Sequence, residues 1–144
     1  MPKSILIIDD NEEIASLLRD HLLTMGFSVS VAIDGNSGVE KALKLTPDII
    51  TMDFNMPGAN GVEVYKELRK HPETAAIPVI FFSSIVTGLI RRMVPENPRV
   101  RFLKKPCNIA EIEKNITEMA ALPKQAPPAS SPDNSQDPPP PKKK

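Results

Sequence analysis

Several short apolar runs in this sequence end in polar side chains of the types that bind metal ions and transfer charged groups. Three are carboxylates, one is a hydroxyl and one is an ammonium: Asp9, Asp10, Asp53, Ser83 and Lys105. Clustered carboxylates repel one another, and two or three of them with water suit the octahedral oxygen shell of Mg²⁺. A carboxylate can also attack phosphorus, and a cation with a hydroxyl donor then stabilises the phosphoryl oxygens. If these side chains converge, they favour phosphoryl transfer onto a carboxylate.

Convergence requires the apolar runs to be strands of one sheet. Runs as short and continuous as Ser4 to Ile8 fit strands buried on both faces of a parallel sheet. The predicted strands cover residues 4–8, 27–31, 48–52, 78–82 and, more weakly, 100–103. Segments with helical spacing alternate with them, the first carrying the apolar stripe Ile14, Leu17, Leu18 and Leu22. This alternation predicts an α/β fold with helices on both faces, in which ligand sites lie beyond the carboxyl ends of the strands.

Helix-stop and helix-capping residues predict where the helices begin and end. Gly26 is a predicted helix stop, and Pro47 ends the second helical segment at Thr46. Asn108, with Glu111 three residues later, resembles a capping box at the start of the last helix.

Composition and charge exclude several classes of function. The chain has 144 residues, of which 40% are hydrophobic and 25% are charged, and its formal net charge is 0. No general attraction to nucleic acid or to an anionic membrane is therefore expected. The N-terminus is no signal peptide, and no apolar stretch approaches the roughly 18 residues of a membrane helix. We expect a cytoplasmic protein without membrane insertion.

The C-terminal segment differs in composition from the rest. Eight of the 16 prolines lie after Leu122, and alanines are the only apolar side chains there. Such a segment buries too little surface to offset its ordering entropy, so residues 123–144 are predicted to be a disordered, proline-rich tail with polyproline II character. The folded domain is predicted to cover residues 3–122. No output domain follows it, so we expect a stand-alone protein that acts by docking to a partner, unless the chain is a fragment.

The motifs together resemble the receiver domain of two-component response regulators. The resemblance covers residues 3–122 and rests on four motifs in the family's order and at its separations. They are ILIIDD ending at Asp10, Asp53 followed by Met56-Pro57 and Gly61, PVIFFSS ending at Ser84, and FLKKP ending at Pro106. The resemblance implies a flavodoxin-like receiver fold, a doubly wound five-stranded parallel sheet of strand order 2-1-3-4-5.

The resemblance also implies a role for each site residue. Asp53 is the phosphoryl acceptor, Lys105 contacts a phosphoryl oxygen, and Ser83 and Phe102 are the two switch positions. The implied Mg²⁺ ligands are the carboxylates of Asp10 and Asp53 and the backbone carbonyl of Asn55, with Asp9 acting mainly through water. The implied partners are a sensor histidine kinase or a phosphotransfer protein, which supplies the phosphoryl group, and an output protein of unknown identity.

Departures from the family pattern concentrate between Ser84 and Arg101. The helix expected there has no clear apolar stripe, and Pro95 should end it. We therefore predict an unusual, weakly helical output face with basic character from Arg91, Arg92, Arg99 and Arg101. Phosphorylation is expected to pull Ser83 toward Asp53, to let Phe102 fill the vacated space, and to reset this segment.

The sequence is also compatible with two other functions. The first is an interaction module that keeps the receiver fold without phosphorylation, which the unusual segment favours but the complete set of site residues does not. The second is a phosphatase or phosphotransferase of the haloacid-dehalogenase kind, which also uses an aspartate at a strand end. That family needs a second acid two residues later, where this chain has Asn55.

Overall fold

The computed structural model describes residues 3–54, 56, 60–83, 92–94, 98–105 and 108–122, with only the backbone of Ile109. The predicted tail and most of the segment 84–98 lie outside the described residues. The five strands are β1 (Ser4–Ile8), β2 (Ser28–Ala32), β3 (Ile49–Met52), β4 (Val79–Ser83) and β5 (Val100–Lys104). The helices are α1 (Glu12–Thr24), α2 (Gly35–Leu45), α3 (Gly61–Lys70) and α5 (Ile109–Ala120).

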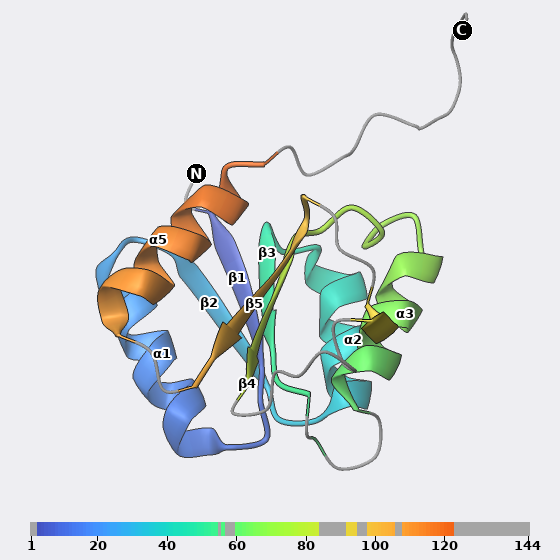
Figure 1. Cartoon of the computed structure of the whole chain (residues 1–144), viewed down its shortest axis with the longest axis horizontal. Coiled ribbons are helices and arrows are strands. Elements are labelled where there is room, and N and C mark those ends of the chain that lie inside the picture. The colour runs from blue at the N-terminus through green and yellow to red at the C-terminus, as the bar shows by residue number, and fades with distance from the viewer. Residues whose placement is uncertain are drawn as a thin grey trace, which may run out of the picture.

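All five strands form one parallel sheet of order β2-β1-β3-β4-β5. Helices α1 and α5 cover one face of this sheet, and α2 and α3 cover the other (Figure 1). The predicted doubly wound α/β fold and its strand order are therefore confirmed. Because the strands are parallel, their carboxyl ends all lie at the same end of the sheet.

Two layers of aliphatic side chains explain why the strands are almost wholly apolar. In β1, Ile5 and Ile7 face α1 and α5, whereas Leu6 and Ile8 face α2 and α3. Alternate side chains of a strand point to opposite faces, so a central strand covered on both faces must be apolar throughout. One sequence expectation was wrong: Leu17, which the spacing assigned to the buried stripe of α1, is 68% exposed.

Polar caps determine where the helices begin. The side chains of Asn11, Asp34, Asn60 and Asn108 each accept a hydrogen bond from a backbone N–H in the first turn. The predicted cap at Asn108 is confirmed, because its side chain accepts from the Glu111 N–H. A complete reciprocal capping box occurs instead at Asn60 and Glu63, where the sequence interpretation had not placed one.

The predicted helix stops are also confirmed. Helix α1 ends before Gly26, which has a φ of 94° in the left-handed region that glycine tolerates. Helix α2 ends at Leu45, and Thr46 closes it with a φ of 41° immediately before Pro47. Both stops return the chain to the amino-terminal edge of the sheet, so each following strand delivers its last residue to the opposite edge.

Candidate functional site

The carboxyl ends of β1, β3, β4 and β5 bring the predicted site residues together. The Asp53 N–H donates to the Ile8 carbonyl oxygen at 3.1 Å, which places Asp53 beside the acidic pair that follows β1. The Lys105 N–H donates to the Ser83 carbonyl oxygen at 2.8 Å, which aligns the end of β5 with the end of β4. The backbone hydrogen bonds between neighbouring strands thus continue one residue past the strand ends, and they bring the site residues side by side.

Three carboxylates form the acidic part of this site. Asp9, Asp10 and Asp53 each offer one oxygen, and these oxygens lie within 4.8 Å of one another. Asp9 is buried, and both of its oxygens are engaged: Oδ1 accepts from the Asn11 N–H at 2.9 Å, and Oδ2 accepts from Lys105 Nζ at 2.6 Å. Asp10 is exposed to solvent. An oxygen cluster of this size fits a hard divalent cation such as Mg²⁺.

The Asp53 carboxylate is held from two sides. Its Oδ1 accepts a hydrogen bond of 2.6 Å from the Ser83 hydroxyl, which is fully buried. Its Oδ2 lies 3.4 Å from Lys105 Nζ, farther than the Asp9 oxygen that the same ammonium contacts. The Asp53 and Lys105 side chains each keep 12% of their surface exposed. The Asp53 carboxylate is therefore oriented by protein donors and still reachable from solvent.

Comparison with known proteins decides the family. Residues 5–117 match the family model described as the response regulator receiver domain. The chain belongs to the response regulator receiver family. Receivers are signalling modules of two-component systems rather than catalytic enzymes, and they work with histidine kinases. No helix within the described ranges has the length and apolar character needed to cross a membrane.

Individual relatives support this assignment. A DNA-binding dual master transcriptional regulator, RpaA of Synechocystis, is 34% identical over 114 residues. That match covers 78% of this chain and 46% of the regulator, so the chain spans about half the length of this curated relative. The structure of a protein described as a response regulator from Chloroflexus aurantiacus has a TM-score of 0.77 and 25% identity, covering 85% of this chain and all of that one.

A third similar structure has a metal ion. It is the receiver domain of a sensor histidine kinase from Pseudomonas aeruginosa, with a magnesium ion coordinated in its active-site cleft. Its TM-score is 0.75, and the match covers 85% of this chain and 100% of that chain. At 22% identity, the likeness shows the shared fold alone.

The two positions to which the resemblance gives switch roles, Ser83 and Phe102, both lie at this edge of the sheet. The Ser83 hydroxyl is fully buried and donates to the Asp53 carboxylate, which satisfies its need for a hydrogen-bond partner. Its movement on phosphorylation stays a prediction. Phe102 is half-buried and already packs against the apolar layer under the site.

An aromatic stack holds Phe102 in that position, and the sequence interpretation missed it. Phe54, the residue after Asp53, stacks on Phe81 with ring centroids 4.5 Å apart and planes within 2°. Phe81 in turn stacks on Phe102 at 5.4 Å and contacts Tyr65 of α3 at 5.7 Å. Each such pair contributes about 0.5–1.5 kcal/mol beyond its area burial. The three phenylalanines lie far apart along the chain, so no local signal in the sequence indicates the stack.

Gly61 lets α3 approach Asp53 closely. Its N–H donates to the Phe54 carbonyl oxygen at 2.9 Å. A Cβ at this position would lie 2.5 Å from the Asp53 carbonyl oxygen and 2.9 Å from the Phe54 Cα. The glycine that the family motif includes is therefore required by contact with the backbone of Asp53 and Phe54.

The predicted basic output face is only partly described. Asn55, Ile85 and Arg91 lie outside the described residues, as does most of the segment expected to be weakly helical. Arg99 donates to the Ala76 carbonyl oxygen, and Arg101 pairs with Glu118 and Asn115 of α5. The charge of Arg101 is therefore balanced locally, and Arg92 is exposed.

Proposed function

We propose that this receiver is a phosphorylation-dependent switch whose acceptor is Asp53, with the phosphoryl group supplied by a sensor histidine kinase, a phosphotransfer protein or a small phosphodonor. The observation that carries this proposal is the pairing of contacts at Asp53. One carboxylate oxygen is held by the Ser83 hydroxyl at 2.6 Å and the other faces the Lys105 ammonium at 3.4 Å. These groups are the donors that a bound phosphoryl group needs.

The transfer itself is a substitution at phosphorus. An Asp53 oxygen forms a bond to phosphorus while the bond from phosphorus to the donor's imidazole nitrogen breaks. The electron pair leaves with the imidazole, which takes a proton from solvent, and an acyl phosphate remains on Asp53. Ser83 and Lys105 then hydrogen-bond the oxygens of the new phosphoryl group. Lys105 is positioned for this by Asp9, which holds its ammonium 2.6 Å away.

The acidic cluster supports Mg²⁺ as the cofactor. Asp10 and Asp53 would bind it directly, with the Asn55 backbone carbonyl, which lies outside the described residues, as a further ligand. Asp9 would act through water, because both of its oxygens already accept hydrogen bonds. When bound, Mg²⁺ supplies positive charge that offsets the negative charge of the transferred group. The magnesium ion in the Pseudomonas receiver supports this assignment.

The test is labelling of the full chain with acetyl phosphate and Mg²⁺, read as a mass increase of one phosphoryl group. Asp53→Asn should abolish the adduct, whereas Asp20→Asn, a change at an exposed aspartate of α1, should leave it unchanged. Labelling that persists in Asp53→Asn would place the acceptor elsewhere. Without Mg²⁺, labelling should fall sharply because a dianion would approach a cluster of carboxylates.

Metal binding can be measured separately by calorimetry or by amide shifts. Asp10→Ala should weaken Mg²⁺ binding more than Asp9→Ala does, because Asp10 is the more exposed of the two and Asp9 is occupied by Lys105. Equal losses in the two variants would contradict the division of roles between them.

One observation favours a second function, an interaction module that acts without phosphorylation. It is the segment 84–101, which has no clear apolar stripe and contains Pro95 and Pro98. The same labelling experiment separates the two functions. A stoichiometric adduct supports the switch, and no adduct under conditions that label other receivers supports the module.

A further inference from the structure

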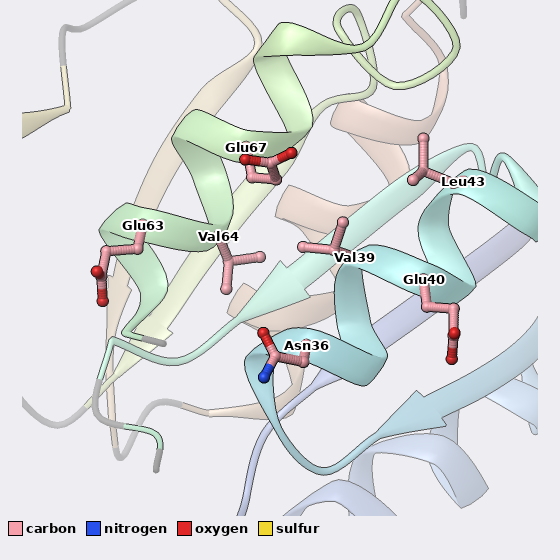
Figure 2. Close-up of a pocket in the computed structure, with 7 residues that line it drawn as sticks. All are labelled: Asn36, Val39, Glu40, Leu43, Glu63, Val64 and Glu67. Atoms are coloured by element: carbon pink, nitrogen blue, oxygen red, sulfur yellow. The ribbon is translucent and has the colours of Figure 1, made fainter. Parts of the chain in front are cut away.

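A groove between α2 and α3 lies on the face of the sheet opposite α1 and α5 and apart from the phosphoryl site (Figure 2). Its volume is about 480 Å³. The α2 side is lined by residues at helical spacings of three and four, which form one face of that helix: Asn36, Val39, Glu40 and Leu43. The α3 side is lined by Glu63, Val64 and Glu67.

The groove combines an apolar floor with an acidic rim. Val39 and Val64 point toward each other across it, and Leu43 continues the floor (Figure 2). Glu40, Glu63 and Glu67 stand at its edges. Hydrogen bonding from His71, with the charge of Lys70, holds the pKa of Glu67 below its usual value, so that carboxylate stays ionised. The groove therefore suits an occupant that is apolar along its length and positively charged.

The dimensions favour an extended occupant over a helical one. A helix is about 10–12 Å across and rises about 5.4 Å per turn, so roughly one turn would fill the groove. The same three or four residues in polyproline II conformation, at about 3.1 Å per residue, spread over about 10 Å along the groove. Polyproline II chains are also preformed and lose little entropy on docking.

We propose that the groove binds the end of this chain's own tail, the segment Pro138–Lys144. Its sequence, PPPPKKK, places four proline rings before three lysines. The rings provide an apolar surface for Val39, Leu43 and Val64, and the ammonium groups carry the charge opposite to that of the glutamates. Glu40 and Glu63 are the exposed members of this set, whereas Glu67 already contacts Lys70 and His71. Exposed ion pairs of this kind are individually weak, so the docked and free tail are in exchange. The proposal does not depend on phosphorylation of Asp53.

The tail is long enough to reach the groove. Helices α2, α3 and α5 all run opposite to the strands, so their C-terminal ends lie at the same end of the sheet (Figure 1). The tail therefore starts at the end of the molecule where the Leu43–Glu67 end of the groove lies. Crossing from one helix layer to the other takes about 20 Å, because each layer is about 10 Å thick. The residues between Leu122 and Pro138 extend about 50 Å in polyproline II conformation.

Paramagnetic relaxation in the full chain tests the proposal. A nitroxide is attached at Ser135→Cys in a Cys107→Ser background, which leaves the prolines and lysines intact. Amide signals of residues 36–43 and 63–67 should lose most of their intensity, and reduction of the label should restore it. The loss should disappear in Glu40→Lys, at an exposed position of α2, and in about 0.5 M salt, which screens the ion pairs.

Two controls identify the source of any effect. Asp20→Lys makes the same charge change at an exposed site of α1, on the other face of the sheet, and should leave the broadening unchanged. Changing Lys142, Lys143 and Lys144 to glutamate alters only the tail and should abolish it. Broadening that is absent, spread evenly over the domain or retained in Glu40→Lys overturns the proposal. Broadening that appears between labelled and unlabelled copies overturns it in favour of a second molecule.

Discussion

Replacing Gly61 with alanine should damage both the stability of the receiver and the proposed phosphoryl-acceptor site at Asp53. The new Cβ would lie 2.5 Å from the Asp53 carbonyl oxygen, whereas ordinary contact begins near 3.4 Å. Either α3 or the segment carrying Asp53 must therefore move by about 0.9 Å. The atoms it meets belong to the backbone, so no side-chain rotation relieves the contact.

The magnitude follows from two opposing effects. Overpacking of this kind costs about 1–3 kcal/mol. Alanine recovers part of this because glycine is disfavoured in helices by roughly 0.5–1 kcal/mol, and less at the first helical residue. A net loss of about 1–2 kcal/mol should lower the Tm by about 4–8 °C in a domain of this size. Because a misplacement of about 1 Å can cost on the order of 100-fold in rate, labelling by acetyl phosphate should slow at least 10-fold.

Gly38→Ala is the matched control. Its Cβ would lie 2.7 Å from the Ile8 Cδ1 atom, the flexible end of a side chain, and the position is inside α2. The gain in helix propensity and the cost of local repacking should nearly cancel. The unfolding free energy of this variant should therefore stay within about 1 kcal/mol of that of the unchanged protein, and its labelling should not change. If Gly61→Ala keeps both its Tm and its labelling rate, the close approach of α3 to Asp53 is not real.

Three further predictions concern stability and the lifetime of the phosphoryl group. Thr51→Val should raise the unfolding free energy by about 1–2 kcal/mol, since the buried Thr51 hydroxyl has no hydrogen-bond partner in the described part of the chain. Thr74→Val should lower the unfolding free energy by a similar amount, because it removes a 2.5 Å hydrogen bond to the Leu68 carbonyl oxygen. Urea unfolding of the two variants measures whether the effects have opposite signs. Removing residues 123–144 should change the Tm by less than about 3 °C. A tail that is docked half the time contributes only about RT ln 2, or about 0.4 kcal/mol, to the unfolding free energy. A drop in Tm beyond about 5 °C, measured by calorimetry, would mean that the tail is part of the fold. The resemblance to receivers implies that Ile85, two residues after Ser83, flanks the path of the water that hydrolyses the phosphoryl group. An apolar side chain cannot orient that water, so Ile85→Glu should shorten the half-life of the labelled protein, and an unchanged or longer half-life would count against that role.

The sequence by itself determined the element order, the parallel sheet and the grouping of the candidate site residues. Continuous apolar runs such as Ile5 to Ile8 can be satisfied only by burial on both faces, which a parallel sheet provides. Polar residues at the ends of such runs then meet at one edge, so Asp53, Ser83 and Lys105 could be grouped before any coordinates existed. These features can be predicted from the sequence because each strand and its terminal polar residue involve only a few neighbouring residues.

Sequence patterns could not determine the partners of those site residues. Lys105 lies closer to Asp9 than to Asp53, although the two carboxylates are 96 and 52 residues away along the chain. Which of the two carboxylates Lys105 contacts depends on the positions of three strand ends to within about 1 Å. The spacing of apolar residues along the sequence does not determine those positions. The same holds for Ser83, which contacts Asp53 because burial leaves its hydroxyl in need of a nearby acceptor.

The aromatic stack and the α2–α3 groove also came only from the tertiary structure. Spacing along a strand assigns Phe81 to a face of the sheet, but stacking with Phe54 and Phe102 requires the register of β4 and β5 and the path of the loop after β3. The acidic rim likewise unites Glu40 of α2 with Glu63 and Glu67 of α3. Helical periodicity orients each helix toward the sheet, whereas the packing of one helix beside another decides which exposed side chains share a groove.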